Sequence, residues 1–293
     1  MQKIVPHLWY DKEALEAAKL YVSLFDQSYI VNTVTIPDTP SGDAELVEFR
    51  LANLNFSAIS AGPYFTFNPS VSLMVACETK EEVDRLYHAL SPGGSELMPL
   101  DEYPFSKYYV WLSDKYGLGW QLMLVEDASE HPKIRPCLLF SGSACGFAEA
   151  AAAFYTSVFR EVKKGYFNYY KPGEAVDPRA KVNYGEVDIL GTSIVIMDHG
   201  YGADFTFNEA FSFEVLCNDQ KEIDYYWDKL SAVPEAEQCG WLKDQYGLSW
   251  QIEPAAMKEM MSHGTKEEMK RITEAFLKMK KFDIAALENA RLR

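Results

Sequence analysis

Apolar residues recur along the chain at two spacings, every second residue in some stretches and every third or fourth in others. The first spacing is typical of strands and the second of helices. The pattern predicts a strand at residues 4–10 and a helix at residues 13–24, whose alanines share a face with Tyr21. A capping box at residues 79–82 predicts a second helix that runs to about residue 90. Further strands are predicted at residues 45–54, 56–60, 71–77, 106–113 and 118–125.

The two halves of the chain resemble each other. The run from Trp111 to Gln121 returns from Trp241 to Gln251, identical at eight of eleven places. The second half also repeats the order of predicted elements, over residues 134–253. A fixed offset between such similar segments indicates an internal duplication.

Two stretches in which the copies differ in length are expected to be loops. The second copy has an insertion at residues 171–178, and it lacks most of residues 92–104 of the first copy. Both stretches are rich in Pro, Gly and charged residues, which is typical of surface loops.

The duplication predicts the domain organisation. We expect α+β modules of the order βαβββ at residues 1–128 and 133–256, each folding into a curved mixed sheet with helices on one face. Residues 257–293 carry an apolar stripe at helical spacing, so a C-terminal helical tail should follow. We expect the tail to dock on the second module, with a partner-binding helix as the alternative.

Composition narrows the class of protein. The 293 residues carry a formal net charge of -15, which repels nucleic acid and anionic membranes. The five cysteines show no paired C-x-x-C motif and lie in or beside apolar runs, which indicates reduced thiols. The chain starts without an apolar signal segment and contains no run of eighteen apolar residues, so we expect a soluble, cytoplasmic protein.

The chain resembles the PhnB-like proteins of the vicinal oxygen chelate superfamily, which includes glyoxalases, bleomycin-resistance proteins and dioxygenases. The resemblance covers nearly the whole chain, and it is carried by Pro6-His-Leu-Trp-Tyr10, by the D-x-Y-G-x-x-W hairpin of both copies and by the ending at residues 275–284. It implies sheets that curl around a small-molecule cavity. Proteins of this branch are often described as 3-demethylubiquinone-9 3-methyltransferases, but nothing in this sequence resembles the glycine-rich loop with which such enzymes hold their cofactor. We therefore expect no methyl transfer.

The resemblance also implies where a metal would bind. Metal-dependent relatives place His or Gln on the first strand and Glu on the last, and hold a divalent ion with open positions. In this chain Gln121 and Gln251 occupy the place of that Glu. His7 is then the one imidazole on a strand, and it is the candidate metal ligand. A divalent metal is a possible cofactor, although two neutral amides are poor replacements for carboxylates.

Strand alternation predicts which other side chains face the cavity. On the last strand, residues between apolar positions turn inward, which selects Gln121, Gln251 and Glu253. The same argument turns His7 and Trp9 inward on the first strand. By this parity the ligand-binding candidates are Trp9, Trp111, Gln121, Cys137, Trp241 and Gln251.

Two carboxylates are candidates for catalysis. Glu214 and Glu253 both have the inward parity, and a buried carboxyl with a raised pKa is a candidate general base. The alternative is that they are rim carboxylates in water, as the tryptophans could equally serve core packing.

These residues predict a protein that binds a small molecule in a concave, aromatic-lined cavity, with no reaction assigned. One alternative is a metal-dependent lyase, isomerase or dioxygenase that acts on a small oxygenated substrate. Another is a structural or interaction module without a ligand. We expect a monomer with internal pseudo-symmetry or a homodimer.

Overall fold

The computed structural model describes residues 2–159 and 162–292. The chain forms two compact units that do not coincide with the sequence repeats. Unit 1 combines Met1–Ser23, Gln27–Thr66 and Asn208–Arg293. Unit 2 combines Leu24–Asp26 with Phe67–Phe207.

Each repeat contains two βα segments, which carry the two helices predicted for each copy. The first repeat consists of β1 (Ile4–Tyr10), α1 (Ala14–Leu24), β2 (Tyr29–Thr39), β3 (Gly42–Leu51) and β4 (Leu54–Ser60), then β5 (Val71–Cys77), α2 (Lys80–Leu90), β6 (Ser95–Tyr103), β7 (Ser106–Ser113) and β8 (Gly119–Leu124). The second consists of β9 (Ile134–Phe140), α3 (Ala148–Val158), β10 (Val162–Tyr169), β11 (Val182–Ile189) and β12 (Thr192–Asp198), then β13 (Phe211–Cys217), α4 (Gln220–Leu230), β14 (Trp241–Lys243) and β15 (Ser249–Pro254). In the last segment the short 3₁₀ helix Pro234–Ala236 stands where the others have a further strand.

The two repeats exchange strands. The sheet of unit 1 has the order β14-β15-β13-β1-β4-β3-β2, and that of unit 2 the order β10-β11-β12-β9-β5-β8-β7-β6. The antiparallel pairs β1–β13 and β5–β9 each join one repeat to the other. The prediction that each copy forms its own sheet is therefore wrong. Residue alternation fixes which face of a strand is buried, but it does not fix which strand lies at its edge.

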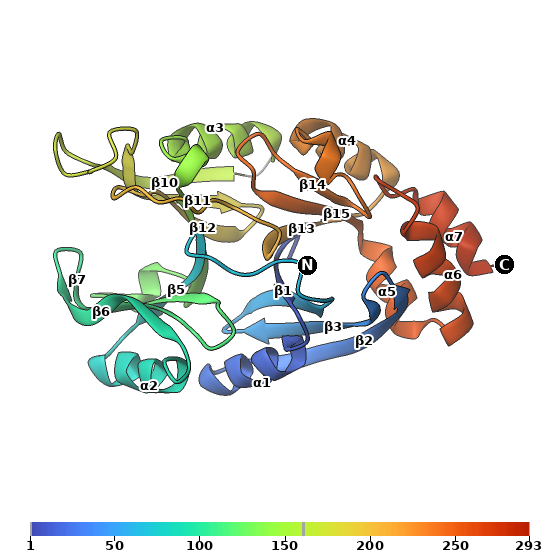
Figure 1. Ribbon diagram of the computed structural model, residues 1–293, viewed down its shortest axis with the longest axis horizontal. Helices are drawn as coiled ribbons and strands as arrows, with labels where there is room; N and C mark the ends of the chain where they lie inside the picture. The colour runs from blue at the N-terminus through green and yellow to red at the C-terminus, as the bar shows by residue number, and fades with distance from the viewer. Residues whose placement is uncertain (1, 160–161, 293) are drawn as a thin grey trace. The chain divides into compact units, whose positions relative to one another are not determined.

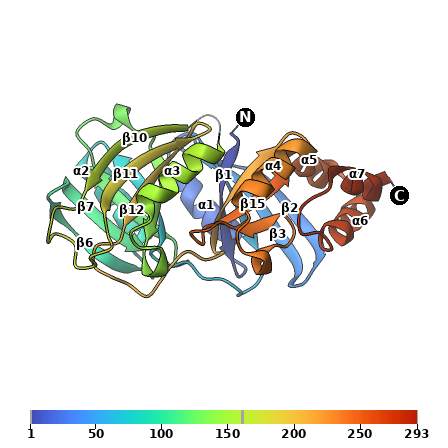
Figure 2. The same ribbon diagram turned by 90° about the horizontal axis from the view of Figure 1, so that it is seen from above.

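The predicted α+β class with curved mixed sheets is confirmed. Helices α1 and α4 lie on the outer face of the unit 1 sheet, and α2 and α3 lie on that of unit 2 (Figure 1). From above, α3 crosses β10 to β12 (Figure 2). Outward strand residues meet these helices, since the Tyr10 hydroxyl lies 3.3 Å from that of Tyr21 on α1.

One expected loop is a strand. Residues 92–104 contain β6, which pairs with β7 and forms the edge of its sheet. Pro99 lies within β6, and its register with β7 shifts three times. Proline is tolerated in edge strands because no second ladder needs its missing N–H. A proline-rich composition therefore misled the sequence argument at this place.

The C-terminal tail is a set of three helices, α5 (Ala255–His263), α6 (Lys266–Phe276) and α7 (Ile284–Leu292). All three belong to unit 1, and they contact the first repeat as well as the second. Lys270 on α6 pairs with Asp38 on β2 at 3.1 Å, and Ser262 on α5 accepts a hydrogen bond from Asn32. The tail thus docks on the second repeat as predicted, through α5 against β15, and it also packs against β2 of the first repeat. Within the described residues, no helix is long and apolar enough to cross a membrane.

Candidate functional site

The most similar motif of the two repeats is structural. In the first copy, Asp114 Oδ1 accepts hydrogen bonds from the backbone of Tyr116 and Leu118, and Oδ2 accepts one from Trp120 Nε1 at 2.9 Å. Asp244 makes the same three contacts in the second copy. The D-x-Y-G-x-x-W sequence thus closes a hairpin, with Gly117 at φ +91° in the turn.

The predicted site residues fall into two groups, each drawn from both repeats. The unit 1 sheet brings together His7 and Trp9 on β1, Glu214 on β13, Trp241 on β14, and Gln251 and Glu253 on β15. The unit 2 sheet brings together Trp111 on β7, Gln121 on β8 and Cys137 on β9. The inward orientation predicted by strand alternation holds, whereas the grouping by repeat does not.

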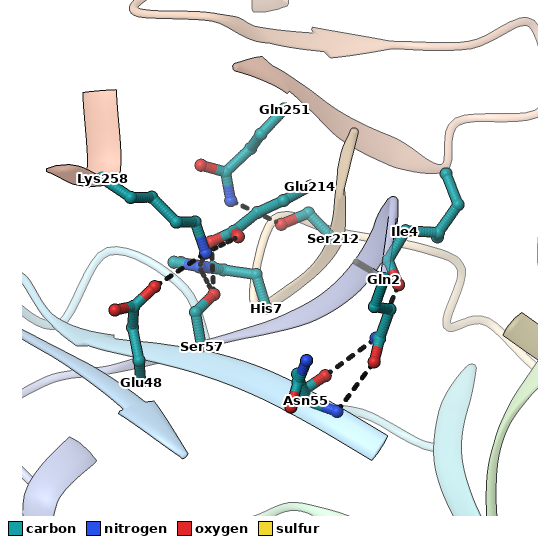
Figure 3. A network of polar contacts seen from close by, with 10 residues as sticks. All are labelled: Gln2, Ile4, His7, Glu48, Asn55, Ser57, Ser212, Glu214, Gln251 and Lys258. Carbon is teal, nitrogen blue, oxygen red and sulfur yellow. Dashed lines mark hydrogen bonds and ion pairs between the residues drawn. The ribbon is translucent and has the colours of Figure 1, made fainter. Parts of the chain in front are cut away.

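A buried polar network surrounds His7 in unit 1 (Figure 3). His7 Nδ1 lies 2.7 Å from Ser57 Oγ and 3.1 Å from Glu214 Oε1. Ser57 Oγ also donates a short hydrogen bond to Glu214 Oε1. Strands β1, β4 and β13 position these side chains, because His7 is opposite Ser57 on one side and Ser212 on the other.

These contacts select a tautomer of His7. The Ser57 hydroxyl uses its hydrogen on Glu214, so Nδ1 of His7 must carry a proton to complete its own contacts. In the neutral ring Nε2 then has a lone pair. Nε2 is buried and has no hydrogen-bond partner among the residues that the structure describes.

Lys258 completes the network from the tail. Its ammonium on α5 lies 2.9 Å from Glu214 Oε2 and 2.9 Å from Glu48 Oε1 (Figure 3). Burial acts to lower the pKa of Lys258, but the charges of Glu214 and Glu48 outweigh it and raise that pKa. The tail thus delivers a fixed positive charge to the concave face.

The pKa values of the two candidate catalytic residues, Glu214 and Glu253, are shifted in opposite directions. Burial acts to raise the pKa of Glu214, but Lys258 and the hydrogen bonds from His7 and Ser57 lower it to about 2. The expectation of a raised pKa is therefore wrong for Glu214, because sequence reasoning did not foresee Lys258. Desolvation, reinforced by the charge of Glu214, raises the pKa of Glu253 to about 8.

Aromatic rings flank the imidazole. The Trp241 ring meets His7 edge to face with centroids 5.7 Å apart, and it lies 6.1 Å from the Trp9 ring. Trp9 also packs against Phe65 at 5.1 Å and donates from Nε1 to the carbonyl of Gly62. Trp241 thus contacts the His7 ring, and Trp9 extends this aromatic group away from it.

The same positions of unit 2 carry different chemistry. By strand register, Cys137 is the counterpart of His7, Val195 that of Ser57, and Met74 that of Glu214. These three residues form a buried apolar cluster. The Gln–Ser pair is kept in both units, since Gln251 Nε2 donates to Ser212 at 2.9 Å and Gln121 Nε2 donates to Ser72 at 2.8 Å.

The remaining predicted residues of unit 2 lie on its concave face. Tyr109 donates to Gln121 Oε1 at 2.7 Å, which fixes the amide. Trp111 is opposite Gln121 on the next strand, and its buried Nε1 has no partner within the described part of the chain. Burial raises the pKa of the Cys137 thiol to about 12, so this thiol stays protonated at neutral pH.

The donor set around His7 does not fit a divalent ion. Both oxygens of Glu214 already have partners, and one of these is the Lys258 ammonium, whose charge opposes a cation. Among the described residues, no group of three or more His, Cys, Asp or Glu side chains could hold a metal. The role of His7 as a metal ligand stays an untested prediction.

Sequence reasoning missed three members of the unit 1 network, Ser57, Glu48 and Lys258. Ser57 has the inward parity on its strand, so alternation could have found it. Lys258 follows Ala255, Ala256 and Met257 just after the last strand, which is a weak signal. Its long side chain reaches a site that spacing cannot predict.

A hollow of about 490 Å³ lies elsewhere in unit 1. It is lined by Asp11, Lys12, Ser41, Asp43, Glu45, Ser60, Gly62, Pro63 and Tyr64. Ser60 Oγ accepts from the backbone of Ala14 at the start of α1, so the hollow lies on the helix-covered side of the sheet. None of the predicted site residues lines it.

Comparison with known proteins supplies the family. A family model described as 3-demethylubiquinone-9 3-methyltransferase matches residues 2–123 and 132–253. No curated protein matches the chain.

Two solved structures illustrate the similarity. A PhnB protein from Bacillus cereus is 43% identical over 42% of this chain and 100% of its own, with a TM-score of 0.40. Glyoxalase I from Zea mays is 13% identical over 89% of this chain and 98% of its own, with a TM-score of 0.54. The likeness to the maize protein concerns the fold alone.

Proposed function

Because this chain belongs to the family described as 3-demethylubiquinone-9 3-methyltransferase, a PhnB-like branch of the glyoxalase superfamily, we propose that it binds a small planar molecule on the concave face of unit 1. The observation that carries the proposal is His7 Nε2, a buried ring nitrogen without a hydrogen-bond partner among the described residues. Buried polar atoms are ordinarily hydrogen-bonded. A ligand with an N–H or O–H group would supply the missing donor.

The surroundings of His7 restrict the ligand's chemistry. Trp9 and Trp241 offer ring faces and edges to a flat apolar body. Two carboxylates, Glu48 and Glu214, pair with the ammonium of Lys258, while the raised pKa of Glu253 keeps that carboxyl protonated at neutral pH. An anionic ligand is disfavoured there, so the proposed ligand is a neutral or cationic planar compound with one hydrogen-bond donor.

Methyl transfer is not part of the proposal. Strand β1 is followed by Asp11-Lys12-Glu13, and the chain has no glycine-rich loop at that place. The fold alone carries little weight for a reaction. The description of the family is therefore no support for methyl transfer by this chain.

A screen followed by titration tests the binding proposal. Planar heteroaromatic compounds that carry an N–H or O–H group should raise the melting temperature, and calorimetry should then give one site per chain. Trp241→Ala and His7→Gln should each weaken binding by about tenfold or more. The matched control Trp111→Ala, in unit 2, should leave the affinity unchanged. Unchanged affinity in both unit 1 variants would refute the proposal.

A second candidate function is proton transfer to or from the bound molecule. The raised pKa of Glu253 favours it, because a carboxyl that titrates near the working pH is an effective acid or base. If Glu253 serves this role, Glu253→Gln should abolish turnover of the ligand and leave its affinity intact.

The metal-assisted alternative has its own test. Elemental analysis of protein purified without chelator should give less than about a tenth of an equivalent of any divalent metal. A stoichiometric metal that raises ligand affinity would favour the metal-dependent lyase, isomerase or dioxygenase and overturn the metal-free proposal.

A further inference from the structure

The concave face of unit 2 is lined by apolar side chains, several of which contain sulfur. Met74, Cys137 and Val195 form its buried centre, and Met123, Met197 and Tyr184 pack against them. The Cys137 thiol donates to Met197 Sδ at 3.7 Å. Thioether side chains are unbranched and repack readily around different shapes. This lining can therefore accept an apolar body.

One charged side chain interrupts the lining. Arg135 on β9 is 1% exposed, and Nη1 donates to Glu186 Oε1 at 2.7 Å. The Tyr184 hydroxyl donates to the same oxygen at 2.5 Å. These contacts fix the guanidinium in position and neutralise its charge from one side.

On the other edge of the Arg135 guanidinium, the buried Nε has no hydrogen-bond partner among the described residues. Nη2 donates to the Met74 thioether at 3.8 Å, which is a weak acceptor. The Nε and Nη2 hydrogens of an arginine point in parallel and match the two oxygens of a carboxylate. A buried cationic donor without an acceptor is unfavourable. Met74 can swing aside, since its side chain is flexible.

A second unpaired donor lies on the same row of the sheet. Strand register places Trp111, Gln121, Met74 and Arg135 opposite one another across β7, β8, β5 and β9. The buried Trp111 Nε1 has no partner among the described residues. Among the described residues, unit 1 thus has a ring nitrogen of His7 and the Ser249 hydroxyl without partners, whereas unit 2 has two N–H donors without partners, Arg135 Nε and Trp111 Nε1.

We propose that unit 2 is a separate binding site for a small organic carboxylate, held by the Nε and Nη2 edge of Arg135 with its apolar body among the methionines and Tyr184. The position that carries Arg135 is occupied by Val5 in unit 1. The two concave faces therefore select different ligands, an anion in unit 2 and a neutral or cationic donor in unit 1. This inference does not depend on the function proposed for unit 1.

Calorimetric titration of the full chain with benzoate tests the site. Benzoate should bind at one site, while the neutral benzamide and inorganic phosphate should bind at least about tenfold more weakly. Arg135→Lys keeps the charge but loses the paired donors, so benzoate affinity should fall by about tenfold or more. His7→Gln, in unit 1, should leave it unchanged.

A second variant covers the case in which Arg135→Lys does not fold. Glu186→Gln keeps an acceptor for Nη1 and removes a nearby negative charge, so benzoate should bind more tightly. Equal benzoate affinity in the parent and Arg135→Lys, weaker binding by Glu186→Gln, or loss of binding in His7→Gln alone would each overturn the proposal. Phosphate that binds as tightly as benzoate would also overturn it, because the site would then recognise charge without the apolar body.

Discussion

His7 and Glu214 lie 207 positions apart in the chain, yet Nδ1 of one is 3.1 Å from Oε1 of the other. The contact exists because β1 of the first repeat pairs with β13 of the second. Each repeat supplies half of each concave face, so neither copy alone contains a complete site. This arrangement also lets the two faces diverge, one towards a polar network and the other towards a thioether lining.

The raised pKa of Glu253 predicts a pH dependence of stability. The folded chain retains a proton that the unfolded chain loses between pH 4.5 and about 8. The stabilising contribution is present below pH 4.5 and is lost as pH rises through about 8. Glu253→Gln should therefore become more stable relative to the parent as pH increases, by up to about 1.4 kcal/mol per pH unit.

Urea unfolding at a series of pH values measures this difference. The control Glu235→Gln, at an exposed position, should follow the parent at every pH. If the free energies of unfolding of Glu253→Gln and the parent change with pH in parallel, Glu253 is ionised in the folded state and the prediction is wrong.

Lys258 should stabilise unit 1 far more than its place in the tail suggests. Lys258→Met leaves the buried Glu214 without its counter-ion and should lower the free energy of unfolding by about 3 kcal/mol. Adding Glu214→Gln should restore part of that loss, because no buried charge then remains unpaired. Lys270→Met is the matched control in the same tail, since its pair with Asp38 is exposed and should add little. Equal effects of the two lysine variants would contradict this assignment.

Asp114 and Asp244, the aspartates of the two hairpins, should contribute equally to the stability of the protein. Asp114→Asn and Asp244→Asn each place an amide N–H against the indole N–H of the following tryptophan. Each variant should lose about 2 kcal/mol of unfolding free energy. Gln245→Ala, in the same turn, is the control and should be near neutral. An effect in only one repeat would contradict a shared structural role.

Strand alternation was sufficient to predict the facing of most site residues. His7, Trp9, Gln121 and Gln251 all turn to the concave side, because their strand neighbours Leu8, Trp120 and Trp250 are fully buried on the helix side. Such a period of two is a local property, and the sequence alone displays it.

Strand alternation could not predict which strands pair with each other or where the C-terminal tail packs. The residues of β1 are compatible with pairing to β5 or to β13, since both have buried faces of similar composition. The choice depends on the whole chain, and local pattern does not report it. Lys258 was missed for a related reason, because its role appears only once α5 has packed against the sheet.

The most direct test of the account is a double-mutant cycle between His7→Gln and Glu214→Gln, measured by urea unfolding of the full chain. Residues in contact couple, so the cycle should give a coupling free energy of about 0.5 to 3 kcal/mol. The control cycle of His7→Gln with Tyr109→Phe, from the other unit, should be additive. Additivity of His7→Gln and Glu214→Gln would contradict the exchange of strands that builds the site.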